Sequence, residues 1–134
     1  MTGALALIII DSLQSLFFQN NTKVSIEHYS KSLKYLAKEL QTPIIVTSNL
    51  SSEAEHRPNK RPVIKDLGDW RDIQEDADII LLTYVDEIYD WDSPDKGTVE
   101  LLIEKNVYGP QGMVRAIYTR ENTVFANLKG SEYI

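Results

Sequence analysis

The sequence of 134 residues contains no cysteine, which excludes both a disulfide framework and a cysteine zinc site. Long hydrophobic runs are also missing. The longest, Ala4 to Ile10, is far shorter than the ~20 residues of a membrane-spanning helix, so we expect no membrane partner. The first residues, Met1-Thr2-Gly3, lack the basic region of a signal peptide. These absences together predict a cytoplasmic protein.

Positive charge is scarce as well. There are 14 Lys and Arg against 20 Asp and Glu, which gives a formal net charge of −6. This balance argues against non-specific adhesion to nucleic acid, although a local basic loop could still bind it. The hydrophobic fraction of 43% excludes a disordered chain, and the length suits one domain with its own core. We therefore predict a single domain over residues 1–134.

A phosphate-binding loop of the form Gly-x-x-x-x-Gly-Lys-Ser/Thr is absent too. None of the six glycines is followed by a lysine. In proteins that have this loop, its backbone N–H groups surround the phosphates of a bound nucleotide. Nothing else in the 134 residues could replace it.

Apolar runs and one amphipathic stretch alternate in the first part of the sequence. Residues 4–10, 43–49 and 78–85 are short apolar runs, which are typical of strands buried on both faces. Residues 24–41 predict a helix because apolar side chains recur every three or four positions, and Thr42-Pro43 ends it. The apolar face of this helix consists of Ile26, Tyr29, Leu33, Leu36 and Leu40.

The later part is richer in turn signals. Residues 51–77 are polar and irregular, with a short helix over 67–77, and residues 86–97 form a loop. The residues Tyr108-Gly109-Pro110-Gln111 predict a hairpin connection. The whole order predicts an α/β fold, with a parallel first half, helices packed on a mixed sheet, and a C-terminal antiparallel hairpin. The strands of the second half are predicted over residues 98–106, 112–119 and 123–128.

Asp11 directly follows the first apolar run. Ligands of open α/β sheets bind beyond the carboxyl ends of the strands, and a carboxylate at this position helps to hold Mg²⁺ in P-loop NTPases. The alternative is an ordinary Asp that ends the strand and caps the next turn. Two isolated histidines, and an Asp-rich loop without the glycine and glutamate of an EF-hand, offer no further metal site.

Basic residues gather between positions 53 and 65. Arg61 and Lys65 belong to this group, and Trp70 and Arg71 follow it. Taken by themselves, these residues are more typical of a solvated loop with a tryptophan that packs in the core. The alternative is a surface for single-stranded nucleic acid, on which cationic side chains contact phosphates and an aromatic ring stacks on a base.

Read together, several segments resemble DnaB-type replicative DNA helicases. The run Leu7 to Gln14 resembles the Walker B segment of that family, and residues 36–51 resemble its next helix and sensor strand. Lys105 and the glycines that follow it resemble the hairpin whose finger acts on a neighbouring subunit. The ordered segments cover residues 5–128. The other matching residues are Arg61-Pro62, Asp66-Leu67, Ile73, Asp76 to Ile79, Tyr84, Asp86-Glu87 and Tyr89.

The resemblance implies the second part of a hexameric helicase motor domain, with a partial RecA-like P-loop NTPase fold. It also implies ATP and Mg²⁺ in the family, and ATP hydrolysis that drives translocation on single-stranded DNA in replication. By resemblance Asp11 has the Walker B role, Asn49 the sensor position and Lys105 the role of the finger lysine. Asp11 would hold Mg²⁺ only with a partner that carries the Walker A loop.

Departures from the family pattern, chiefly the missing Walker A loop, catalytic glutamate and finger arginine, predict that this chain alone is inactive and binds neither ATP nor Mg²⁺. The Walker A loop and the catalytic glutamate are not in the sequence. Val107 replaces the finger arginine, a residue worth about 10³–10⁵ in rate in related systems. Asn49 replaces a glutamine. In the DNA-binding loop, Gly68, Asp69 and Arg71 replace Arg, Glu and Gly.

In the RecA-like sheet the Walker A strand lies between the strands at 43–49 and 78–85. Unpaired buried backbone groups are costly, so we expect either that these two strands pair directly or that another chain supplies the missing strand.

Three functions remain open. The first is a DnaB-like helicase domain without activity of its own, with weak binding of single-stranded DNA. The second is a non-catalytic module that self-associates as a dimer or higher oligomer, or joins a full-length helicase or a partner carrying the Walker A half. The third is a residual domain without retained activity.

Overall fold

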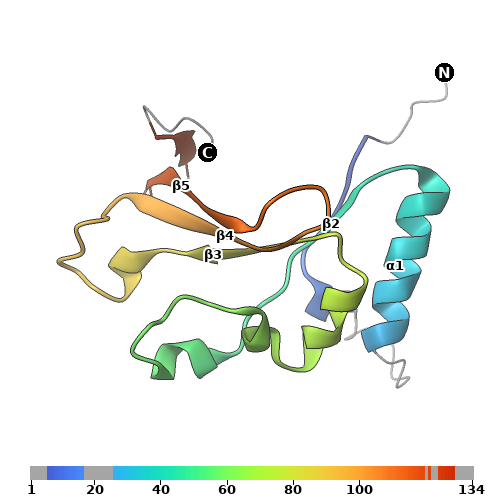
Figure 1. The fold of residues 1–134 in the computed structure, drawn as a ribbon, viewed down its shortest axis with the longest axis horizontal. Coiled ribbons are helices and arrows are strands. Elements are labelled where there is room, and N and C mark those ends of the chain that lie inside the picture. Colours follow the sequence, from blue (N-terminus) through green and yellow to red (C-terminus); the bar gives the residue numbers. More distant parts are fainter. Residues whose placement is uncertain (1–5, 17–25, 120, 122–123, 129–134) are drawn as a thin grey trace. The chain divides into compact units, whose positions relative to one another are not determined.

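The computed structural model describes residues 6–16, 26–119, 121 and 124–128 (Figure 1). The chain divides into two compact units: residues 1–52 with 64–77, and residues 53–63 with 78–134. The single domain over residues 1–134 stays a prediction. Among the described residues, no helix is both long and apolar enough to cross a membrane.

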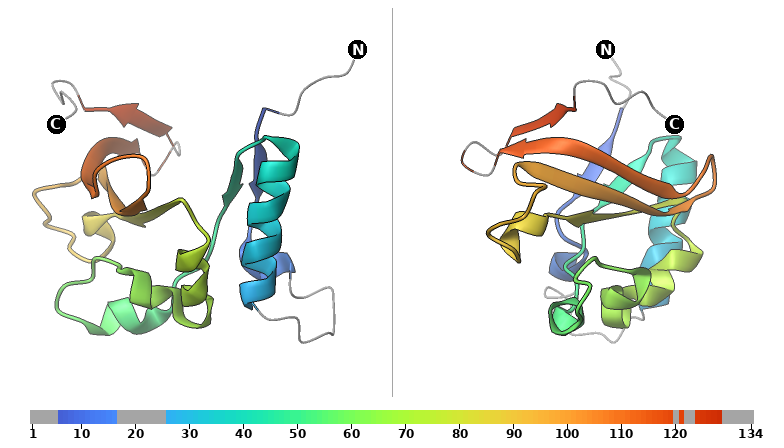
Figure 2. Two further views of the ribbon diagram at one scale, coloured as in Figure 1. Left: turned by 45° about the vertical axis from the view of Figure 1, so that its right-hand side comes forward. Right: turned by 60° about the vertical axis from the view of Figure 1, so that its left-hand side comes forward.

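The first unit contains a β-α-β arrangement. Strand β1 (Ile8–Ile10) pairs in parallel with β2 (Ile44–Val46), and α1 (Ile26–Leu40) connects them (Figure 2). Ile8 lies opposite Ile44, and Ile10 lies opposite Val46. Two parallel strands need such a crossover connection, because a tight turn would make the second strand run antiparallel to the first. The carboxyl ends of β1 and β2 therefore lie side by side.

Helix α1 ends in a Schellman motif, as the Thr42-Pro43 stop signal predicts. Gln41 adopts a left-handed conformation with φ of 49°, and its N–H donates to the carbonyl of Lys38 at 3.3 Å. The N–H of Thr42 donates to the carbonyl of Ala37 at 3.1 Å. These two bonds satisfy carbonyl groups that the helix end leaves without partners.

The short 3₁₀ segments of the first unit are η1 (Leu13–Leu16) and η3 (Ile64–Glu75), whereas η2 (Ser52–His56) lies almost entirely in the second unit. η3 is broken at Gly68, whose φ of 59° and ψ of −125° suit glycine alone. The buried Ser30 of α1 donates to Asp76, which fixes the end of this segment to the helix.

The second unit is an antiparallel meander in the order β3-β4-β5-β6. Figure 1 shows β4 and β5 as long strands running beside β3. Alternate residues of β3 are buried: Ile80, Leu82 and Tyr84 face a core that also contains Val99 of β4. The strands are β3 (Ile79–Tyr84), β4 (Thr98–Asn106), β5 (Gly112–Thr119) and β6 (Val124–Asn127).

The parallel first half and antiparallel second half confirm the predicted α/β order. The prediction that the strands are buried on both faces is wrong. Ile9 of β1, Ile45 of β2, and Ile79 and Leu81 of β3 are each at least half exposed. A single crossover helix can cover only one face of a two-stranded sheet, and β3 is packed only on the face of its even-numbered residues.

Direct pairing of the strands at 43–49 and 78–85 is not what the structure shows. In the described part of the chain, β2 pairs with β1 and β3 pairs with β4, in separate sheets. One edge of β2 and one edge of β3 therefore have no strand partner among these residues, and their backbone groups can accept another strand.

Candidate functional site

Polar side chains meet at the carboxyl ends of β1 and β2. Asp11 follows β1 and Thr47 follows β2, and the Thr47 hydroxyl donates to Asp11 Oδ1 at 2.5 Å. The backbone supports this pair, since Thr47 N–H donates to the carbonyl of Ile10 at 3.0 Å and Leu13 N–H donates to the carbonyl of Thr47 at 2.8 Å. The Asp11 carboxylate is exposed at the end of a well-paired strand.

Gln14 connects, through hydrogen bonds, the segments that follow β1 and β2. Its Nε2 donates to Ser48 Oγ at 2.9 Å, and its Oε1 accepts from the backbone N–H of Asn49 at 3.3 Å. Asn49 is exposed on the same unit. The structure thus brings Asp11 and Asn49 to the same end of the sheet; their Walker B and sensor roles stay predictions.

The residues at this edge fit one side of a magnesium–nucleotide site. Mg²⁺ is usually held by one or two carboxylates together with substrate phosphates and waters, and the Asp11 carboxylate and Thr47 hydroxyl are oxygen donors of that kind. The described residues contain no group of three His, Cys, Asp or Glu side chains that could hold a metal without a nucleotide. The 134 residues contain no phosphate-binding loop that could form the other side of such a site.

Lys105 belongs to the second unit. It lies near the end of β4, opposite Ile80 of β3. Val107 follows the strand and is exposed, and its N–H donates to the carbonyl of Asp78 at 3.0 Å. Val107 therefore has a fixed backbone and an apolar side chain that cannot stabilise negative charge; that this is the finger position stays a prediction.

Three of the four predicted DNA-binding residues lie on η3 in the first unit. Lys65 and Arg71 are exposed, and Trp70 is partly buried. Asp66 is fully buried, and its carbonyl accepts from Ser51 N–H at 2.7 Å. This anchor and the turn at Gly68 position the residues that follow.

The fourth, Arg61, lies in the second unit and is bound to a buried carboxylate. Its Nε and Nη2 donate to Glu100 at 2.6 and 2.9 Å, and its guanidinium lies 4.8 Å from the centre of the Tyr84 ring. Arg115 Nη2 donates to the same carboxylate at 3.1 Å. The hydrogen bonds from Arg61 hold the pKa of Glu100 below its usual value, against the effect of burial.

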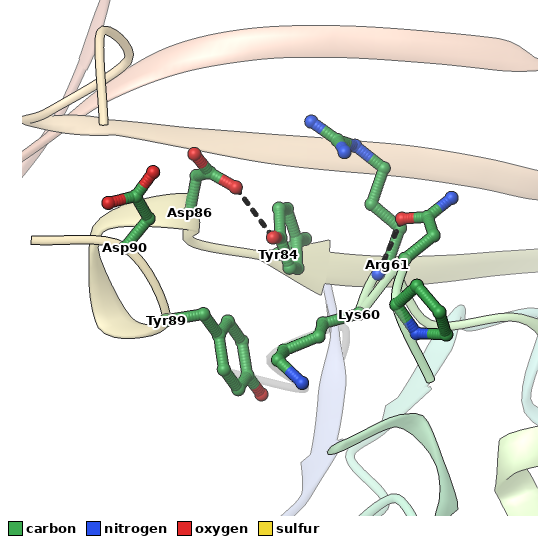
Figure 3. Close-up of a pocket in the computed structure, with 8 residues that line it drawn as sticks. Lys60, Arg61, Tyr84, Asp86, Tyr89 and Asp90 are labelled. Atoms are coloured by element: carbon green, nitrogen blue, oxygen red, sulfur yellow. Dashed lines mark hydrogen bonds between the residues drawn. The ribbon is translucent and has the colours of Figure 1, made fainter. Parts of the chain in front are cut away.

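A pocket of about 440 Å³ lies beside Arg61 in the second unit (Figure 3). Tyr84 and Tyr89 stack there with ring centres 5.8 Å apart, and Lys60 Nζ lies 5.8 Å from the centre of the Tyr89 ring. The Tyr84 hydroxyl donates to Asp86 at 2.6 Å. Burial and this hydrogen bond raise the pKa of Tyr84 to about 12. The remaining lining residues are Pro58, Asn59 and Asp90.

Residue patterns did not reveal this pocket, although Arg61, Tyr84 and Tyr89 all match the family. Two aromatic residues five positions apart, on either side of a strand end, were the available signal. Their basic partners come from residues 58–61, which are distant in sequence, so local pattern alone does not connect them.

Comparison with known proteins gives a consistent result. A model of the DnaB-like helicase C-terminal domain matches residues 1–127. The replicative DNA helicase DnaB of Pasteurella multocida (strain Pm70) is 43% identical over 129 residues, which are 94% of this chain and 28% of that protein. The chain therefore spans little more than a quarter of the length of this relative.

Two solved structures are similar in fold and in sequence. One, described as an ATPase domain, has a TM-score of 0.85 and 37% identity, over 92% of this chain and 44% of its own. The other is described as a DnaB-like replicative helicase with its interactions with primase. It has a TM-score of 0.84 and 37% identity, over 92% of this chain and 31% of its own.

Proposed function

Because the chain belongs to the DnaB-like helicase C-terminal domain family, we propose that it supplies the Walker B and sensor edge of an ATP-driven DNA helicase motor. It acts together with a polypeptide portion that holds the nucleotide phosphates. The observation that carries this proposal is the Asp11–Thr47 pair at the carboxyl ends of two parallel strands in register. Ligands of open α/β sheets bind at such ends.

We assign a part to each of four residues. Asp11 would hold Mg²⁺ when the ion is bound, and Thr47 holds the Asp11 carboxylate in place. Asn49, in the same unit, has the part of the sensor residue, and Lys105, which belongs to the second unit, has the part of the finger lysine. When bound, Mg²⁺ neutralises charge on the nucleotide phosphates. The 134 residues by themselves do not fit ATP, and we expect no hydrolysis by them alone.

The test joins this chain to a phosphate-binding portion. The part of the Pasteurella relative that precedes the matched region is fused to the chain, and ATP hydrolysis is measured. We expect hydrolysis by the fusion that Asp11→Asn abolishes. The matched control is Asp69→Asn, which removes an exposed carboxylate elsewhere in the first unit. Equal rates for Asp11→Asn and Asp69→Asn would contradict the assigned role of Asp11.

DNA contact is assigned to η3. Lys65 and Arg71 contact phosphates there, and Trp70 contributes its ring. With a net charge of −6 the chain binds single-stranded DNA weakly. Anisotropy of a labelled oligonucleotide should show lower affinity for Lys65→Ala and Arg71→Ala, with a smaller salt dependence. Lys38→Ala on α1 is the control with the same charge change.

A second candidate, a non-catalytic module that associates with its own copies, is favoured by the exposed Ile9 and Ile45 of the two-stranded sheet. Apolar side chains in neighbouring strands gain free energy when a second surface covers them. Light scattering over a range of concentrations should then show masses above that of a monomer, and Ile45→Lys should lower them. A monomer mass at every concentration would exclude this candidate.

A further inference from the structure

The loop between β3 and β4, residues 86–97, presents apolar side chains to solvent. Trp91 is 81% exposed, Ile88 57% and Tyr89 43%. Exposed apolar groups that are scattered singly need no explanation, but three within four positions mark an interaction surface. Tryptophan and tyrosine are also among the residues that contribute most to protein interfaces.

The loop is held in one conformation by its own hydrogen bonds. The buried Ser93 donates through its hydroxyl to Asp86 Oδ2 at 2.6 Å and accepts from the backbone N–H of Asp95 at 3.0 Å. Gly97 N–H donates to Glu87 Oε2 at 2.9 Å. A loop fixed in this way loses little conformational entropy on binding, so its exposed side chains are ready for a partner.

The charge of the loop limits which partner it fits. Residues 86–95 contain five carboxylates. Asp86, Glu87 and Asp95 are used internally, the last by Arg115 at 3.0 Å, and Asp90 Oδ1 accepts from the backbone N–H of Asp92 at 3.0 Å. Asp90 and Asp92 are exposed on either side of Trp91. A negative field around an apolar centre favours a basic partner and repels the phosphates of a nucleic acid.

The indole of Trp91 already interacts with a cation. Lys96 Nζ lies 4.6 Å from the centre of its ring, within the range of a cation–π interaction. The ring is nevertheless 81% exposed, so most of its surface is available. An arginine or lysine from a partner can stack on this ring and pair with the neighbouring carboxylates.

We propose that loop 86–97 is a docking site for a basic, apolar segment of a partner protein. An arginine or lysine of that segment stacks on Trp91 between Asp90 and Asp92, and an aliphatic side chain next to it packs on Ile88. None of these residues belongs to the Asp11 edge, so the inference stands independently of the proposed ATP-linked role.

The test uses a labelled peptide of alternating arginine and leucine as the probe, with anisotropy as the readout. We expect Trp91→Ala to weaken binding at least tenfold, about 1.4 kcal/mol. The double variant Asp90→Asn with Asp92→Asn should weaken binding and reduce its salt dependence. The matched control removes two exposed carboxylates elsewhere, through Glu39→Gln and Asp72→Asn.

Lys96 provides a second readout. Because it competes with the probe for the indole, Lys96→Ala should strengthen binding several-fold, and Lys38→Ala, with the same charge change, should not. Equal affinities of wild type and Trp91→Ala would overturn the proposal. So would equal binding of a glutamate–leucine peptide or of single-stranded DNA at this loop, or loss of self-association in Trp91→Ala. Circular dichroism should show that each variant is folded, since Trp91 contributes little buried area.

Discussion

At the scale of single residues, Glu100 holds two arginine side chains of the second unit in place. It is 2% exposed and accepts hydrogen bonds from both Arg61 and Arg115. A buried carboxylate with two guanidinium partners depends on all three groups, because removal of one leaves an uncompensated charge. The same geometry explains why Arg61, a DNA-binding candidate on sequence grounds, has its guanidinium turned toward the protein.

Glu100→Gln should lower the free energy of unfolding by about 2 kcal/mol. This is less than the ~3–5 kcal/mol of a fully buried pair, because Arg61 and Arg115 are more than a third exposed and solvent screens them. Urea unfolding measures the difference, and Glu104→Gln on the same strand is the control, with an expected change within about 0.5 kcal/mol.

The contribution of Glu100 should also depend on pH. Its pKa in the folded state is lowered from the ordinary value of 4.5, chiefly by the hydrogen bonds from Arg61. The stability is therefore present above that value and is lost as the pH falls through the folded pKa. Between neutral pH and about pH 3, wild type should lose more stability than Glu100→Gln. Parallel curves for the two proteins would contradict this assignment.

Val107 is the second residue whose side chain we expect to matter, here for the rate of ATP hydrolysis. By resemblance it stands at the family's finger position, and it lies on an exposed turn with its backbone fixed to Asp78. Val107→Arg in the fusion with a phosphate-binding portion should raise ATP hydrolysis by about 10³-fold or more, because an arginine there stabilises transition-state charge. Val107→Gln, which adds a polar but uncharged side chain, should not. Equal rates for the two variants would show that this position has no finger role.

At the scale of elements, the strength of the local signals decided which predictions succeeded. Strands β4 and β5 have the predicted bounds, since two strand-like runs flank a glycine- and proline-rich turn. The single helix predicted over 67–77 is wrong in detail, because Gly68 divides a longer 3₁₀ segment that begins at Ile64. The sequence alone does not show whether a glycine within a polar stretch has a positive φ.

The end of α1 offers a test of element stability. Gln41 holds a left-handed conformation that costs an L-residue roughly 1–2 kcal/mol, a cost that glycine avoids. Gln41→Gly should therefore raise the free energy of unfolding by about 0.5–1 kcal/mol, after the greater freedom of glycine in the unfolded chain is counted. Thermal unfolding measures it. Glu39→Gly, inside the last turn, should instead lower stability by about 1 kcal/mol.

At the scale of the whole molecule, the sequence predicted the α/β order and the family but not which surfaces remain open. Apolar runs indicate strands, but they do not show whether the residues that cover those strands belong to the same chain. The exposure of Ile9, Ile45 and Leu81 shows that a covering layer is lacking in the described residues. The Arg61–Glu100 ion pair joins residues 39 positions apart, and such contacts depend on the folded topology.

The central claim is that this chain carries one side of a nucleotide site and lacks the phosphate-binding side. Titration calorimetry of the 134-residue chain with ATP and Mg²⁺ tests it most directly. No heat of saturable binding is predicted, because no backbone loop surrounds the phosphates. Saturable binding of ATP that Asp11→Asn removes would contradict the claim.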